Sequence, residues 1–351
     1  MKKERNSNFE LLRIVSMILI VAHHYSIHGE YDTISGLHIN KLYVQFLSMG
    51  GKLGVNLFVL TTGFFMINST LKLKSVIKLI SQTWFYSISL LFIAYYFNLT
   101  PISINQIVKS VFPILFSSYW FITVFIVLYL LIPFLNIYIN KLDYKKYSYL
   151  IILMIILQVL IPKNLGFGNV DWFIFLYFLG GYISKFPKLF TKNNSIYLTV
   201  FMVAYFSIFV TIVIFDYFNF RSPLYFIASS TPFILISSIS LFSFFKNLKT
   251  KNNKYINLIA SSVFGVYLIH DNMFIRPYIW KELFKNNDYY FSNYLYIHSF
   301  IAIILVFIIS IIIDLFRIKI VSLLKIEFLQ DLITHTIKQK KNYVVELIKN
   351  I

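Results

Sequence analysis

The residues best placed to do chemistry lie in the first apolar segment, residues 9–28, which carries a cation and an imidazole. Arg13 and His24 are eleven positions apart. In an α-helix this spacing is three turns plus about 20°, so both side chains lie on one face, about 16 Å apart along the axis. Glu10 lies one turn before Arg13 on the same side. The segment therefore predicts an anion-binding cation near one end and a titratable group further along.

Each of these residues also has a structural interpretation. Arg13 could extend to lipid phosphates, and His24 could be a packing residue between helices. His23 points about 100° away from His24 and is the weaker candidate. Ionisable residues inside apolar segments are energetically unfavourable and usually functional, which favours Arg13 and His24 as site residues.

A second imidazole lies late in the chain, at the end of the segment 256–275. His270 is followed by Asp271, and we expect both on the same side of the membrane as the outer half of the first segment, where His24 lies. The two histidines would then share a cavity. The alternative is a histidine that only forms a hydrogen bond at the membrane interface.

Four further residues are candidates with equally plausible structural roles. Asn56 is either a polar contact to a substrate or a hydrogen bond between helices, and Trp120 is either a supporting residue or part of an interfacial aromatic belt. Lys74 and Lys78 are one helical turn apart at the start of an apolar segment. This spacing suits a phosphate, although basic residues there are also common membrane anchors.

The elements that carry these residues are predicted to be membrane-spanning helices. Of the 351 residues, 58% are hydrophobic and only 13% are charged, whereas soluble domains contain about 25% charged residues. The apolar segments do not alternate in polarity as barrel strands do. The fold class is therefore all-α, a polytopic bundle of about ten transmembrane helices. The expected segments are 9–28, 46–68, 76–97, 119–139, 148–161, 170–185, 195–215, 224–245, 256–275 and 295–316, with an interfacial piece at 102–118.

The net charge of +18 reflects topology rather than nucleic-acid binding. The 32 Lys and Arg residues concentrate in alternate loops on the side of the N-terminus. By the positive-inside rule both termini are then cytoplasmic. We expect one transmembrane domain over residues 1–316 and a cytoplasmic amphipathic tail over 317–351. The chain has no cysteine and no metal-ligand spacing, so no metal site is predicted.

Several short motifs resemble one known family, the acyltransferase family 3 membrane proteins, over about residues 6–316. Asn8-Phe9-Glu10-Leu11-Leu12-Arg13-Ile14 followed by His24 is similar to its first-helix signature. Gly54-Val55-Asn56-Leu57-Phe58 with Thr62-Gly63-Phe64 resembles its second-helix motif, with Thr62 in place of the usual Ser. Tyr119-Trp120-Phe121 with Pro133 and Phe264-Gly265-Val266-Tyr267-Leu268-Ile269-His270 resemble two later motifs. The chain departs from the family where many members have an Arg-x-x-Arg and it has Lys74 and Lys78.

The resemblance implies transfer of an acyl group, usually acetyl, from cytoplasmic acyl-CoA to a cell-surface or lipid-linked polysaccharide. Arg13, with Lys74 and Lys78, would bind the phosphates of the CoA. His24 would act as general base on a sugar hydroxyl or carry the acyl group transiently. Acetyl-CoA is then a co-substrate, and no permanently bound cofactor is expected. The location implied is a bacterial plasma membrane, with membrane lipids and glycan-assembly proteins as partners and no nucleic acid.

Two alternatives from other classes remain open on the sequence. A flippase or exporter of glycan or lipid precursors would use Arg13 and the histidines for binding and proton relay, without CoA. A membrane scaffold would use its polar residues only to fix helix packing. The absence of a recognisable internal repeat argues against the transporter.

Overall fold

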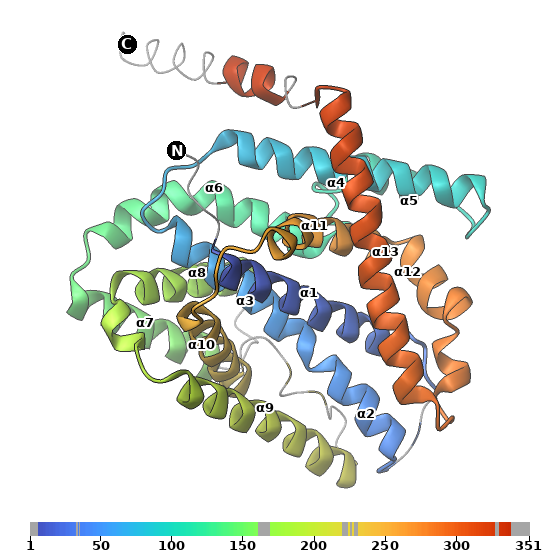
Figure 1. Cartoon of the computed structure of the whole chain (residues 1–351), viewed down its shortest axis with the longest axis horizontal. Coiled ribbons are helices and arrows are strands. Elements are labelled where there is room, and N and C mark those ends of the chain that lie inside the picture. The colour runs from blue at the N-terminus through green and yellow to red at the C-terminus, as the bar shows by residue number, and fades with distance from the viewer. Residues whose placement is uncertain are drawn as a thin grey trace.

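The structure, a computed structural model, describes residues 6–32, 34, 36–160, 169–219, 224, 227, 231–326 and 330–337. In these residues every regular element is a helix, and the helices form one bundle (Figure 1). Parts of the expected fifth and eighth segments, and the tail after residue 337, lie outside the described residues.

The first helix, α1 (Ser7–Ile27), lies in the middle of the bundle (Figure 1). It packs against α3 (Gly50–Met66), α11 (Lys254–His270) and α13 (Leu295–Leu323). Leu12 and Val21 are fully buried within it. Because α1 is surrounded by other helices, its polar side chains face protein and cavities rather than lipid.

The other helices surround this centre. Their bounds are α2 (Ile39–Ser48), α4 (Leu73–Tyr96), α5 (Ile104–Val111), α6 (Trp120–Asn140), α7 (Tyr144–Ile155), α8 (Asn169–Lys185), α9 (Asn194–Tyr217), α10 (Pro232–Asn247) and the single turn α12 (Ile275–Pro277). Short irregular helices are η1 (Ile156–Leu160), η3 (Pro187–Phe190), η5 (Tyr278–Leu283) and η6 (Asn286–Tyr289).

Close approach of helices depends on small residues, as the second expected segment predicted. Gly63 of α3 faces α8 so closely that an added Cβ would lie 2.2 Å from the Tyr177 carbonyl oxygen. Gly180 of α8 meets the Leu60 carbonyl in the same way, at 2.3 Å. The two glycines allow α3 and α8 to pack closely, and a larger residue at either position would push the helices apart.

Each of the ten expected segments overlaps a helix in the described residues, and the second, 46–68, contains α3 and the end of α2. Within those residues six helices are long and apolar enough to cross a membrane, or seven if the bent pair formed by 254–270 and 275–289 counts as one span. α10 is apolar but shorter. The chain is thus a helical membrane protein, while the count of ten crossings and the cytoplasmic termini stay predictions.

The interfacial piece expected at 102–118 contains the short helix α5. Ser103 starts it with a capping box, in which Ser103 accepts from the Gln106 backbone N–H and Gln106 accepts from the Ser103 backbone N–H. This reciprocal pair satisfies two backbone donors at the helix start. The last helix, α13, runs to Leu323, past the expected domain end at residue 316. Arg317 is therefore a helical residue of the bundle rather than of a separate tail.

Candidate active site

A cavity of about 980 Å³ lies between α1, α3, α4, α6, α11 and α13. Its volume is at the upper end of the range for small-molecule sites, which suits a large ligand. Most of its wall is aromatic or aliphatic, including Phe58, Phe121 and Phe125. The charged residues of the wall are Glu10, Arg13, Lys78 and Arg317.

Three of the four predicted donor-side residues lie on this cavity. Arg13 is ion-paired with Glu10 at 3.5 Å, and its side chain is 42% exposed, so it is still accessible to a ligand. Both residues also line a neighbouring cavity of about 490 Å³. Lys78 lies on the wall contributed by α4. Arg13 and Lys78 thus lie on one cavity although they come from different helices, as the predicted anion site requires.

Lys74, the fourth predicted donor-side residue, lines neither of these two cavities. Its ammonium group is 2.6 Å from the carboxylate of Asp331, and both side chains are about half exposed. The lysine pair predicted from its spacing is thus divided between two roles. Lys78 faces the cavity, and Lys74 binds the segment that follows α13.

The two histidines predicted to share a site are in direct contact. His24 on α1 and His270 at the end of α11 are buried, and His24 Nδ1 lies 2.8 Å from His270 Nε2. His270 Nδ1 lies 2.6 Å from the Val266 carbonyl oxygen. A carbonyl only accepts, so His270 Nδ1 carries the hydrogen, and in neutral His270 the Nε2 atom is the acceptor.

This arrangement fixes the tautomer of His24. His24 Nδ1 must donate to His270 Nε2, and Nε2 of neutral His24 keeps its lone pair. The hydrogen bond at Nδ1 also fixes the orientation of the ring. This arrangement would allow His24 to accept a proton at Nε2, while the hydrogen bond to His270 holds the ring.

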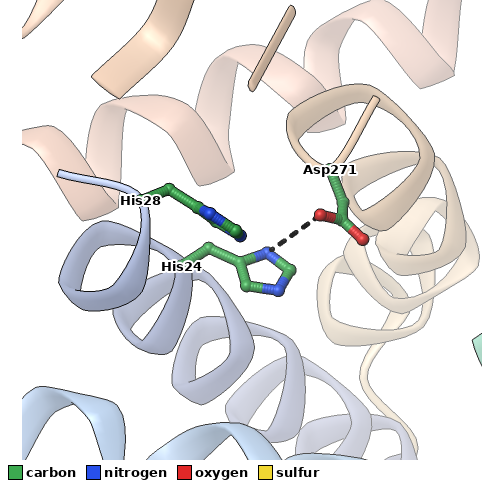
Figure 2. Close-up of side chains that lie close together, drawn as sticks. All are labelled: His24, His28 and Asp271. Carbon is green, nitrogen blue, oxygen red and sulfur yellow. Dashed lines mark ion pairs between the residues drawn. The ribbon is translucent and has the colours of Figure 1, made fainter. Parts of the chain in front are cut away.

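A carboxylate and a guanidinium complete the cluster. Asp271 Oδ1 lies 3.8 Å from His24 Nδ1, and Figure 2 shows the carboxylate reaching toward the imidazole from the facing helix. Arg276 Nη1 donates to the same oxygen at 3.0 Å. Once His24 accepts a proton, the negative carboxylate stabilises the positive imidazolium across this short distance.

The same cluster contains residue types that can hold a metal. His24, His28 and Asp271 each place one ligand atom within 4.8 Å of the others (Figure 2), and the two histidines are one helical turn apart. However, His24 Nδ1 and Asp271 Oδ1 are engaged with His270 and Arg276. The cluster is thus connected by hydrogen bonds to His270 and Arg276.

The cavity and the histidine pair are neighbours but not continuous. Neither His24 nor His270 lines the two cavities described above. Met17, two turns before His24 on α1, and Tyr267, three residues before His270, are on the wall. Tyr267 is buried and its ring packs edge-on to that of Phe121 at 5.7 Å. A ligand that extends from the cavity to His24 must pass this aromatic barrier.

The remaining predicted supporting residues make structural contacts. His23 Nδ1 donates to the Ser48 carbonyl at 2.7 Å, and its ring packs on Gly51. Asn56 is completely buried, donates to Ser238 Oγ at 3.2 Å and accepts from Trp172 Nε1 at 3.0 Å. For Asn56 the structure thus favours the alternative of a hydrogen bond between helices.

The Trp120 side chain contacts a lysine inside the bundle. The Lys52 ammonium group lies 4.7 Å from the centre of its indole ring, a cation–π contact between α3 and α6. The aromatic ring therefore has a partner within the protein as well as its place at a helix start.

Sequence reasoning missed Arg317 and Tyr267 as cavity residues. Arg317 was counted among the basic residues of the tail, although a signal was present: Asp314 precedes it by three positions inside an apolar helix. An acidic and a basic residue at this spacing in a membrane helix indicate a buried pair. Tyr267 also had a signal, since it lies in the quoted motif that ends at His270 and precedes His270 by three positions.

The helical bundle thus combines a large cavity of cationic and aromatic lining with a buried histidine pair beside it. Comparison with known families identifies the one to which the chain belongs. The sequence model of an acyltransferase domain, that of acyltransferase family 3, matches residues 6–315. The chain therefore belongs to this family and is a membrane acyltransferase. No curated protein and no solved structure is significantly similar to it.

Proposed function

We propose that the chain transfers an acetyl group from cytoplasmic acetyl-CoA to a hydroxyl of an extracytoplasmic or lipid-linked cell-surface glycan, with His24 as general base. The observation that carries this proposal is the hydrogen bond from His24 Nδ1 to His270, which leaves Nε2 free to accept a proton. The same helix presents Arg13 to the large cavity three turns away.

The donor is assigned to the cavity because of its charge and size. Arg13 and Lys78 would bind phosphates of the CoA, and the apolar wall would hold its extended pantetheine arm. Glu10 is within 3.5 Å of Arg13 and would orient its guanidinium. The thioester would reach His24 after passing Tyr267 and Phe121, whose side chains would have to rotate.

The reaction follows from the geometry of the histidine pair. His24 Nε2 accepts the proton of the acceptor hydroxyl while the hydroxyl oxygen attacks the thioester carbonyl carbon. The carbon–sulfur bond then breaks, and the CoA thiolate takes the proton from His24. Asp271 stabilises the transient imidazolium, and His270 keeps the ring oriented.

A transient acyl-histidine is the alternative route to the same products. It uses the same free Nε2 atom as a nucleophile, so the hydrogen bonds alone are compatible with both. We favour the base because it needs one attack rather than two. Incubation with labelled acetyl-CoA without acceptor distinguishes them, since only the second route leaves label on the protein.

The compartment and partners belong to the same proposal. The apolar helices require a membrane, and a cell-surface acceptor would place the protein in a plasma membrane, as in bacteria. Glycan-assembly proteins would deliver the acceptor. Acetyl-CoA is a co-substrate that leaves as CoA in each cycle.

The test is transfer of radiolabel from acetyl-CoA to a cell-surface glycan by membranes containing the protein. The wild type should label the glycan, and His24→Ala should lower the rate by about 10²- to 10⁴-fold, the usual contribution of a general base. His335→Ala removes an exposed histidine far along the tail and should have no effect. Full activity of His24→Ala would contradict the proposal, and glycan export without labelling would favour a flippase.

A further inference from the structure

The last helix contributes a buried ion pair to the wall of the large cavity. Asp314 and Arg317 are one turn apart on α13 and are 0% and 7% exposed. Charged residues at this depth are energetically unfavourable unless they are paired or used. Neither residue has a part in the reaction described above.

Asp314 is held in one position by two neighbouring side chains and by close contact with a glycine. It accepts hydrogen bonds from Gln82 Nε2 at 3.1 Å and from the Tyr86 hydroxyl at 2.7 Å, both on α4. On the opposite side it lies against Gly265 of α11, where an added Cβ would be 2.3 Å from its carboxylate. The carboxylate is thus fixed between α4, α11 and α13.

The fixed carboxylate orients Arg317. Nε donates to Asp314 Oδ1 at 2.7 Å and Nη2 donates to Oδ2 at 3.2 Å, so one edge of the guanidinium is bound bidentately. Neither bond uses Nη1, at the other edge of the planar group. Arg317 also lies on the cavity wall. The guanidinium is thus preorganised by Asp314, and it also lies beside the Tyr86 ring, whose centre is 5.9 Å from Cζ of Arg317.

The charged residues around the cavity favour an anionic ligand. Arg13, Lys78 and Arg317 come from three different helices, and among the described residues that line the cavity Glu10 is the one carboxylate. Three cations that converge on one cavity suit a ligand with more than one phosphate. An arginine with a planar fork of donors is well matched to a phosphate oxygen.

We propose that Arg317, oriented by Asp314, binds a phosphate of the acyl-CoA donor together with Arg13 and Lys78. This inference rests on the proposed function and adds to it a donor-binding residue from the last helix. The alternative is that Arg317 only balances the charge of Asp314. That alternative predicts no dependence on the phosphates of the donor.

The experiment compares two donors, acetyl-CoA and S-acetyl-pantetheine, which has the same thioester and arm but no phosphate. For Arg317→Gln we expect KM for acetyl-CoA to rise about ten- to a hundredfold, the loss expected for one charge-assisted hydrogen bond. KM for S-acetyl-pantetheine and kcat with either donor should change little. Lys319→Gln, which removes an exposed charge two residues further on α13, is the matched control and should match the wild type.

Removal of Arg317 leaves Asp314 buried without its cation and can unfold the protein. The double variant Asp314→Asn, Arg317→Gln keeps the shapes and removes both charges, and it should show the same selective rise in KM. An equal rise for both donors, or no rise in the folded double variant, would overturn the assignment of Arg317. If the wild type used neither donor, the proposed function itself would fail.

Discussion

The proposed reaction depends most directly on His24, and a second histidine, His270, orients its imidazole ring. A His–His pair differs from a histidine bound to a carboxylate because the acceptor is neutral before the reaction. The charge that stabilises protonated His24 must then come from Asp271, 3.8 Å away. In the proposed reaction His270 thus orients His24, and the adjacent residue Asp271 balances its positive charge.

We predict that activity depends on a hydrogen-bond acceptor at position 270 more than on an imidazole ring there. His270→Ala should lower kcat about ten- to a hundredfold because His24 loses the bond that orients it and sets its tautomer. His270→Gln can place its carbonyl oxygen as an acceptor and should keep more of the activity. Steady-state kinetics of both variants test this, and equal losses would contradict it.

The two lysines of α4 should behave differently. Lys78→Gln should raise KM for acetyl-CoA about tenfold, since Lys78 lines the cavity. Lys74→Gln should leave KM within about twofold, because Lys74 is paired with Asp331 outside it. Kinetics with varied acetyl-CoA measure both values. A larger effect at Lys74 would return this residue to the donor site.

Part of the site could be predicted from the sequence because helical periodicity is local. The spacing of Arg13 and His24 follows from 3.6 residues per turn, and the inside-outside alternation placed His270 near His24. The pairing of Lys74 with Asp331 and the wall position of Arg317 could not be predicted. These depend on the distance between α4 and the end of α13, which no local pattern encodes.

At the scale of elements, α1 connects the two halves of the site. One continuous helix carries Arg13 on the cavity and His24 in the histidine pair, and α11 meets it at His270. The packing of α1 between α3, α11 and α13 therefore sets where Arg13 and His24 lie in the bundle.

The contact between α3 and α8 should be sensitive to side-chain size. Gly63→Leu should destabilise the protein by about 1–3 kcal/mol or more, because its Cβ meets the Tyr177 backbone at 2.2 Å and backbone moves less than side chains. Thermal unfolding in detergent measures the change. Val203→Leu on α9, where the side chain is 62% exposed, is the control, and an equal melting temperature for both variants would contradict the packing argument.

The expected elements were found with small errors in their ends, because long apolar segments are a strong signal for helices. The break between α2 and α3 at Met49 lay inside one expected segment, and α13 extends beyond its expected end. Apolar content predicts that a segment is buried in lipid or protein, but it does not mark where a helix bends or how many helices cross completely.

At the scale of the whole molecule, the predicted cytoplasmic and external sides of the loops can be tested by labelling of single cysteines. The chain contains no cysteine, so a single cysteine reports on one loop without background. Lys251→Cys should react with an impermeant maleimide only from the cytoplasmic side, and Lys285→Cys only from the outside. The reverse pattern would invert the bundle and place the donor cavity on the wrong side for cytoplasmic acyl-CoA.

The most direct test of the central claim is transfer across a sealed membrane. Purified protein is reconstituted into proteoliposomes with acetyl-CoA on the face that carries Arg13 and a glycan acceptor on the other. We predict that free CoA and acetylated glycan appear in equal amounts, and that both disappear with His24→Ala. Formation of both products at the wild-type rate by His24→Ala would contradict the account.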